Sequence, residues 1–323
     1  MLYPLTFHPI FKERIWGARN LQRLYGKPLP AGVPIGESWE ISDHQDDVSI
    51  IANGPLAGKD IRWLIERHRD ELLGSAKLAN GRFPLLIKIL DAQDKLSLQV
   101  HPPAETAAQL GGEPKTEMWY VAEARPGAEL FVGLKRGVTR ADFEQKIRDG
   151  TVADCFHRIQ IRAEDAMFLP AGRVHAIGAG IVLFEVQQNS DTTYRVFDWN
   201  RVGAGGRPRE LHVAQSLASI DFCDFEPQLI PRRTRVQHEC EVRPLVDDPL
   251  FSVDVCTMNS GQNFSWMGER MKIIGVVNGR LVVQAGDGGV TLRAGQFCLI
   301  PACAANANLH AETLCNFLRI WIS

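Results

Sequence analysis

The sequence has no cysteine pair of the Cys-x-x-Cys type, although it contains seven cysteines. Their odd number and loose spacing favour reduced thiols over a disulfide framework or a thiolate zinc site. No apolar run approaches the ~20 residues that a membrane-spanning helix requires. Lys12, Glu13 and Arg14 interrupt the apolar N-terminal stretch, which is therefore unlike a secretory signal. We expect a cytoplasmic protein with no membrane partner.

An excess of charge of either sign is also lacking. The 323 residues include 36 Lys and Arg and 38 Asp and Glu, for a formal net charge of -2. No basic surface therefore argues for nucleic acid or for an anionic membrane. A small anionic substrate stays open, because binding it needs only a few local cations. The length is enough for one large or two ordinary domains.

Helical periodicity is scarce. It is confined to four segments: Asp60–Leu73, Ala104–Leu110, Thr139–Asp149 and Glu210–Ile220. None of them resembles the crossover helix of a βαβ series, and short β-like runs bounded by Gly, Pro and Asp dominate the rest. The sequence therefore predicts a mainly β fold with a few peripheral helices.

Two β-rich segments have a similar pattern, Phe83–Trp199 and Lys272–Cys303. In the second, Asn278-Gly279 separates two apolar runs, which predicts a hairpin. The Pro-Arg-Arg stretch at Pro231 suggests a boundary between the two. We therefore expect a catalytic domain over residues 1–230 and a C-terminal lobe over residues 231–323.

One predicted strand carries polar residues at alternate positions. In Lys95–His101 the side chains of Ser97, Gln99 and His101 share one face, opposite three apolar residues. Such a face suits a ligand-lined barrel interior, and it equally suits an edge strand with its polar side in water.

Two further segments supply possible metal ligands. Lys115, Glu117 and Trp119 face the same way by alternation, and Glu117 is either a ligand or a charge at the rim. In Leu169–His175, Pro and Gly form a tight turn before His175, and Pro-x-Gly-x-x-His is the second metal motif of cupins. Two imidazoles, a carboxylate and the carbonyl of Gln99 make a plausible zinc site, although manganese, cobalt or iron would suit the same ligands.

Six stretches of the chain resemble type I phosphomannose isomerases, a family of the cupin superfamily. They are Phe11–Leu21, Ile35–Ser42, Phe83–Pro102, Lys115–Tyr120, Leu169–Ala176 and Asn189–Arg201. The resemblance implies double-stranded β-helix jelly rolls in a bicupin arrangement. It also implies interconversion of mannose 6-phosphate and fructose 6-phosphate, one Zn²⁺ per chain, a small sugar phosphate as partner, and a monomer or small homo-oligomer.

The same resemblance implies a set of site residues. The zinc ligands are Gln99, His101, Glu117 and His175, and Lys115 lies beside the metal. Ser190–Arg195 resembles an active-site segment that contributes Asp191 and Arg195. These two residues are four apart, so in a strand their side chains would point to the same face, which agrees with this placement. We expect catalysis from Arg195, Lys115 and Asp191, and substrate binding from Trp16, Lys88, Ser97 and Arg201.

The chain departs from the family pattern in several places. The stretch from Glu117 to His175 is too short for the helical domain of long members, which indicates the compact bacterial form. Thr192 replaces the Asn that is usual in the family. The long form has a substrate-binding lysine for which Arg201 is the candidate counterpart in this chain. In the second lobe Asn306 stands where His175 stands in the first, so we expect no metal there.

Two other functions fit parts of the pattern. A cupin oxidoreductase using iron or manganese would take Glu105 as a ligand, because His101 and Glu105 reproduce His-x-x-x-Glu of the first cupin motif. A non-catalytic sugar-phosphate-binding regulator would use the metal only to order the fold. The choice of Glu117 or Glu105 as ligand distinguishes the oxidoreductase from the isomerase.

Overall fold

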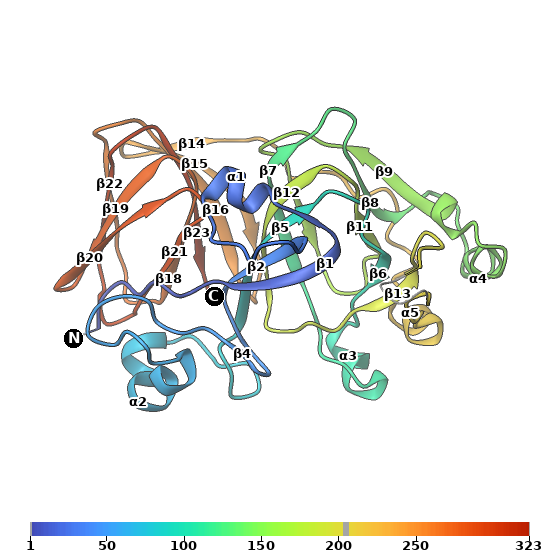
Figure 1. Ribbon diagram of the computed structural model, residues 1–323, viewed down its shortest axis with the longest axis horizontal. Helices are drawn as coiled ribbons and strands as arrows, with labels where there is room; N and C mark the ends of the chain where they lie inside the picture. The colour runs from blue at the N-terminus through green and yellow to red at the C-terminus, as the bar shows by residue number, and fades with distance from the viewer. Residues whose placement is uncertain (1, 203–206, 323) are drawn as a thin grey trace.

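The computed structural model describes residues 2–202 and 207–322, which form two antiparallel β-sandwiches side by side along the long axis (Figure 1). The first sandwich has a six-stranded and a five-stranded sheet. In sheet order, the six strands are β1 (Ile10–Ala18), β2 (Ile35–Ile41), β5 (Leu85–Ala92), β12 (Ile181–Gln188), β7 (Glu117–Ala124) and β10 (Ala166–Leu169). The five are β13 (Tyr194–Phe197), β6 (Leu98–Val100), β11 (His175–Ile177), β8 (Glu129–Leu134) and β9 (Phe156–Gln160).

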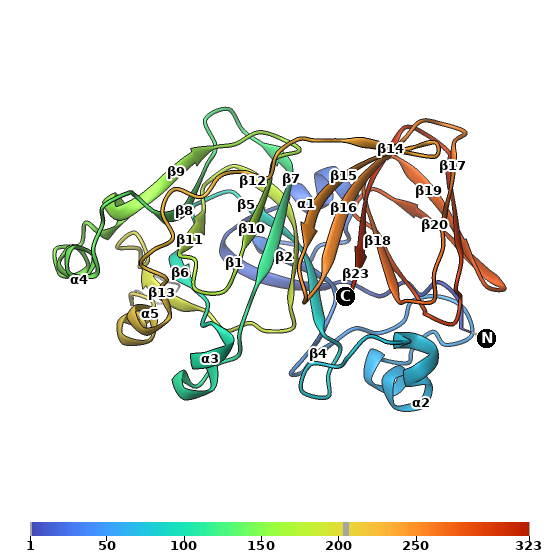
Figure 2. The ribbon, with the colours of Figure 1, turned by 180° about the vertical axis from the view of Figure 1, so that it is seen from behind.

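The second sandwich repeats this plan with a six-stranded and a four-stranded sheet (Figure 2). The six strands are β14 (Arg235–Gln237), β15 (Cys240–Asp247), β16 (Ser252–Met258), β23 (Cys315–Trp321), β18 (Lys272–Asn278) and β21 (Phe297–Ile300). The four are β17 (Asn263–Trp266), β22 (Ala307–Ala311), β19 (Arg280–Ala285) and β20 (Gly288–Arg293). A short ribbon of β3 (Asp43–His44) and β4 (Asp47–Val48) completes the strands. The predicted mainly β, cupin-like architecture is confirmed.

Helices are few and lie at the periphery, as predicted. They are α1 (Asn20–Tyr25), α2 (Ile61–Leu73), α3 (Ala104–Ala107), α4 (Arg140–Arg148) and α5 (Val213–Ser219), with 3₁₀ turns η1 (Ala108–Leu110) and η2 (Val152–Cys155). Side-chain caps explain where two of them begin. The Asp60 carboxylate accepts from the Trp63 N–H, and Thr139 forms a capping box with Asp142. Helix α1 was not expected from the sequence. No helix in the described ranges is long and apolar enough to cross a membrane.

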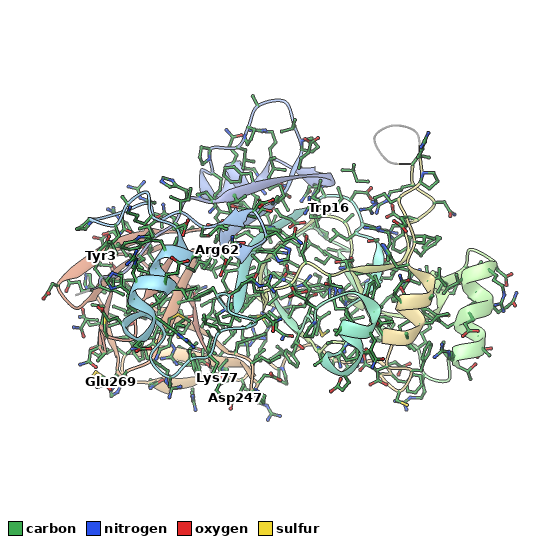
Figure 3. All side chains as sticks on the ribbon, turned by 90° about the horizontal axis from the view of Figure 1, so that it is seen from below. Tyr3, Trp16, Arg62, Lys77, Asp247 and Glu269 are labelled. Atoms are coloured by element: carbon green, nitrogen blue, oxygen red, sulfur yellow. The ribbon has the colours of Figure 1, made fainter. Side chains whose placement is uncertain are left out.

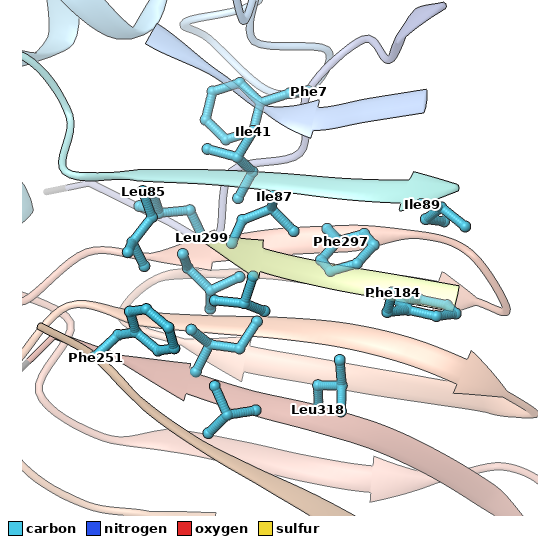
Figure 4. Close-up of a cluster of buried hydrophobic side chains, with 14 of the residues drawn as sticks. Phe7, Ile41, Leu85, Ile87, Ile89, Phe184, Phe251, Phe297, Leu299 and Leu318 are labelled. Atoms are coloured by element: carbon cyan, nitrogen blue, oxygen red, sulfur yellow. The ribbon is translucent and has the colours of Figure 1, made fainter. Parts of the chain in front are cut away.

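The largest hydrophobic core lies between the two six-stranded sheets (Figure 4). Ile87 of β5 and Phe184 of β12 belong to the same cluster as Leu318 of β23. Outward-facing apolar residues of each large sheet are thus buried by the other sandwich. The N-terminal segment strengthens this junction, since Leu5 exchanges two backbone hydrogen bonds with Leu299 of β21. Separate apolar clusters lie between the sheets within each sandwich, and in the first sandwich polar groups share this space.

The hairpin predicted at Asn278-Gly279 is wrong. This turn joins β18 to β19, which lie in different sheets and do not pair. The alternating apolar residues on both strands face the same interior, so the chain crosses the sandwich to bury both faces. Gly279 has φ 83°, and a Cβ there would lie 2.2 Å from the Leu314 carbonyl oxygen. The true hairpin is the next one, between β19 and β20.

Candidate metal centre and adjoining cavity

Three buried side chains converge between the two sheets of the first sandwich. His101 follows β6, Glu117 begins β7 and His175 begins β11, and their ligand atoms all lie within 4.8 Å of one another. The Glu117 carboxylate faces both imidazoles, with Oε2 3.5 Å from His101 Nε2 and Oε1 3.3 Å from His175 Nε2. Glu117 comes from one sheet and the histidines from the other, so only the closed sandwich assembles the cluster.

Backbone carbonyls determine which nitrogen of each histidine faces the cluster. His101 Nδ1 lies 2.7 Å from the Thr192 carbonyl oxygen, and His175 Nδ1 lies 2.9 Å from that of Arg173. A carbonyl only accepts, so each Nδ1 carries the proton and each Nε2 keeps its lone pair. Burial lowers the pKa of both imidazoles, that of His175 to about 3. Both rings are therefore neutral, as metal ligands must be.

The Glu117 carboxylate is ionised. Burial acts to raise its pKa, but Lys115 and His101 hold the pKa well below the usual range. Its Oε2 lies 3.0 Å from Lys115 Nζ. Apart from this ion pair, no hydrogen bond reaches either carboxylate oxygen among the described residues, and His101 Nε2 has no hydrogen-bond partner either. Leaving buried polar atoms unpaired is costly, and a cation bound at this point would satisfy all three. These three residues could hold a metal ion.

Gln99 lies next to this cluster. It pairs with His175 across β6 and β11, and its side-chain nitrogen lies 3.3 Å from His175 Nε2. Amide nitrogen and oxygen exchange places on a half-turn of the side chain, which would direct Oε1 to the same point. Leu98 and Val100 pack into a separate apolar cluster on the other face, as the alternation predicts. Leu96 departs from it and lines the cavity side with Ser97.

A cavity of about 400 Å³ adjoins the cluster. Seven of the eight predicted residues outside the His–Glu–His cluster line it: Trp16, Lys88, Ser97, Gln99, Lys115, Asp191 and Arg195. Trp16, in β1, lies beside the strands of the first sandwich when the molecule is seen from below (Figure 3). The cavity thus gathers side chains from distant parts of the chain around one polar space.

Arg201 is the exception. It does not line the cavity, and its guanidinium binds Asp198, Asp94 and the Lys95 carbonyl. Arg195 in contrast reaches the cavity, with Nη1 bonded to the Glu210 carbonyl at 2.8 Å. Its Nε is buried and has no hydrogen-bond partner in the part of the chain that the structure describes. Arg195 therefore retains an N–H for a ligand, and Arg201 has its partners already.

The structure adds residues that the sequence reasoning missed. Glu37, Glu185, Arg14 and Arg209 also line the cavity. Lys88 Nζ lies 3.3 Å from Glu185 and 3.8 Å from Glu37. The available signal was a charge flanked by apolar residues in each of two strands, Lys88 in β5 and Glu185 in β12. Two such charges of opposite sign are best buried as a pair.

Glu105, the ligand required by the oxidoreductase alternative, lies elsewhere. It is exposed in the first turn of α3 and is outside the cluster of possible metal ligands. Thr192, which departs from the family pattern, holds His101 through its carbonyl and accepts the Glu113 N–H through its hydroxyl. The geometry therefore favours Glu117 over Glu105 as the carboxylate ligand.

Comparisons with known proteins agree with this geometry. Residues 5–125 match the model of the type I phosphomannose isomerase catalytic domain. The chain is 36% identical over 307 residues to mannose-6-phosphate isomerase ManA of Bacillus subtilis, covering 92% of this chain and 93% of that protein. It is 35% identical over 302 residues to mannose-6-phosphate isomerase of Streptococcus mutans, covering 93% of each. The crystal structure of mannose 6-phosphate isomerase from Bacillus subtilis superposes with a TM-score of 0.90 at 30% identity, covering 99% of this chain and 100% of that one. The chain belongs to the type I phosphomannose isomerase family.

Proposed function

We propose that this protein is a zinc-dependent isomerase that interconverts mannose 6-phosphate and fructose 6-phosphate. The observation that carries the proposal is the buried His101–Glu117–His175 cluster beside a cavity lined by Lys115 and Arg195. Full-length relatives named mannose-6-phosphate isomerase support the choice of reaction.

In this proposal His101, Glu117, His175 and Gln99 hold one Zn²⁺ per chain. Two imidazoles, a carboxylate and a carbonyl oxygen suit zinc and leave room at the ion for a water molecule or the substrate. When bound, the ion supplies Lewis-acid stabilisation of negative charge on oxygen. The carbonyl partners of both histidines support the assignment, because they orient each Nε2 towards one point.

The chemical difficulty is removal of a proton from the carbon next to a carbonyl, which generates an enediolate. Lys115 and Arg195 place cationic groups at the cavity, where they stabilise developing oxygen charge without having to reorganise. We assign the proton transfer to Asp191, whose side chain is 40% exposed and lines the cavity. Lys115 is held against Glu117, and Glu185 is buried between Lys88 and Trp119, so both are less accessible to substrate.

The remaining groups that line the cavity are assigned to substrate binding. Arg195 retains a free N–H, and Ser97 adds a hydroxyl, both suited to phosphate or sugar oxygens. Trp16 supplies an apolar face for the sugar ring. Lys88 offers a further ammonium group that it shares with the surrounding carboxylates. Arg201 is left out, since its partners hold it away from the cavity.

We also infer a cytoplasmic location, a monomer or small homo-oligomer, and a division into folding units near residue 230. The location rests on seven cysteines, all of them unpaired. The division rests on the separate cores within the two sandwiches, and β14, the first strand of the second, begins at Arg235.

The test is fructose 6-phosphate production from mannose 6-phosphate by purified protein as isolated, after chelation, and after zinc is restored. We expect activity to disappear with the chelator and to return with zinc. Circular dichroism of the chelated sample controls for unfolding. Absence of turnover in folded, metal-loaded protein would overturn the proposed reaction.

A further inference from the structure

The second sandwich contains a cavity at the position that the metal-site cavity occupies in the first. It measures about 390 Å³ and lies where β17 of the small sheet faces β16 and β23 of the large one. Its lining includes Asp254, Phe264, Trp266, Arg319 and Trp321. The two cavities are nearly equal in volume, about 400 and 390 Å³.

The two large sheets correspond strand by strand, and a central ion pair is present in both. In the first, Lys88 of β5 is the cross-strand partner of Glu185 of β12. In the second, Asp254 of β16 is the cross-strand partner of Arg319 of β23. The strands β5 and β16 are third in their sheets, and β12 and β23 are fourth. The pair is conserved in place between the sandwiches, with its charges exchanged.

The position that Glu117 occupies in the first sandwich also holds a residue of opposite charge in the second. Glu117 of β7 pairs with Gln187, two residues beyond Glu185. The corresponding position of β18 is Lys272, which pairs with Trp321, two residues beyond Arg319. Lys272 is fully buried, and its ammonium donates to the carbonyls of Ala305 and Gly268. A basic residue thus stands where the first sandwich has its metal-binding carboxylate, although Lys272 itself does not line the second cavity.

Arg319 is the central group of this cavity. It is 4% exposed, bonds Asp254 through Nη2, and stacks at 5.0 Å from the Phe264 ring and 5.3 Å from the Trp266 ring. Its Nε is buried without a hydrogen-bond partner among residues 2–202 and 207–322. A buried N–H of a charged group calls for an acceptor.

The rest of the lining adds charge and flat surfaces. Arg235 and Arg270 are exposed at the cavity, and Asp254, already bound by Arg319, is the only carboxylate in the described lining. Trp266 and Trp321 pack edge to face at 5.9 Å. Arginines suit phosphate oxygens, and indole faces suit a flat ring.

We propose that this cavity binds a small phosphorylated molecule carrying a ring, either a sugar phosphate or a nucleotide. The phosphate lies against Arg319, Arg270 and Arg235, and the ring lies on Trp266. This inference is independent of the reaction proposed for the first cavity.

Hydrogen–deuterium exchange on the full chain tests the proposal with three probes: mannose 6-phosphate, adenosine 5′-monophosphate and inorganic phosphate. We expect at least one ring-bearing probe to slow exchange in residues 263–270. Protection there by inorganic phosphate alone, or by none of the three, would overturn the proposal. Mannose 6-phosphate also reports on the first cavity through separate peptides covering residues 97–101 and 191–195.

Matched variants separate a specific site from general attraction of anions. The double variant Arg235→Gln/Arg270→Gln alters exposed side chains, and we expect it to weaken binding in the second sandwich about tenfold or more. Arg293→Gln, exposed in the same sandwich but outside the cavity, is the control and keeps full binding. Equal weakening by both changes would show only non-specific charge and would contradict the proposal. Isomerase activity stays unchanged in all these variants.

Discussion

Lys88 and Glu185 lie directly opposite each other on β5 and β12, and the Lys88 ammonium is 3.3 Å from the Glu185 carboxylate in an almost inaccessible setting. Burial by itself lowers the pKa of Lys88, but Glu185 and Glu37 outweigh it and raise the pKa. Burial and the charge of Glu117 raise the pKa of Glu185. The cavity wall is thus built on a buried charge cluster whose members depend on one another.

Replacement of Lys88 therefore affects stability. We expect Lys88→Met to lower the free energy of unfolding by about 3–5 kcal/mol, because it leaves buried carboxylates uncompensated. Urea-induced unfolding measures the change, with exposed Lys77→Met as the control. The double variant Lys88→Met/Glu185→Gln should recover part of the loss. A Lys88→Met protein as stable as the control would contradict the coupling.

Glu117 and Glu105 offer a direct comparison for metal binding. We expect Glu117→Gln to lower zinc affinity by at least about tenfold, because it removes the anionic member of the cluster. Glu105→Gln, on exposed α3, should keep the metal content of the unmodified protein. Metal analysis after dialysis against a weak chelator measures both. The opposite ranking would revive the oxidoreductase alternative.

We expect replacement of Asp191 to lower the catalytic rate without changing the amount of bound metal. Asp191→Asn should lower kcat by about 10²- to 10⁴-fold, the usual contribution of a positioned proton-transfer group, while zinc content is retained. Asp287→Asn, in an exposed turn of the second sandwich, is the control. An Asp191→Asn enzyme with normal kcat would assign the proton transfer to another group.

Glu37 predicts a dependence of stability on pH. Burial acts to raise its pKa, but Lys88 and Arg14 lower it from 4.5 to about 2. A carboxyl group whose pKa is lower in the folded state than in the unfolded state stabilises the fold at pH values above its unfolded-state pKa. This contribution is lost as the pH falls to the folded-state pKa. The stability advantage of unmodified protein over Glu37→Gln should therefore shrink between about pH 4.5 and pH 2. Chemical denaturation across that range measures it, with exposed Glu66→Gln as the control. A constant difference would contradict this assignment.

The cap of α4 predicts a change in stability alone. Thr139 accepts the Asp142 N–H, and Asp142 bonds back to the Thr139 N–H. Thr139→Ala should cost about 1 kcal/mol of unfolding free energy. The helix is remote from the cavity residues, so kcat and KM should be unchanged. Thermal unfolding measures the expected loss of stability, and steady-state kinetics measure the expected absence of an effect on activity. The variant Thr139→Ser should retain most of the stability.

Local features were predictable because they depend on neighbours in the sequence. The alternation of Leu98, Gln99 and Val100 determined which side chains share a face of β6. The hydroxyl and acidic residues at Thr139 and Asp142 determined where α4 begins. The metal-ligand types in their motif order, together with the family resemblance, were enough to name every residue of the His–Glu–His cluster.

Long-range pairing was decided only by the tertiary structure. Asn278-Gly279 has the local chemistry of a hairpin, but burial of both flanking strands in one interior sends them to different sheets. Arg201 was a candidate by position along the chain, and its ion pair with Asp198 holds it elsewhere. Glu37 and Glu185 meet Lys88 because three strands, far apart in sequence, become neighbours in one sheet. The sequence by itself determined the donor atoms and local conformations, and the register of distant strands determined which of these groups share a buried space.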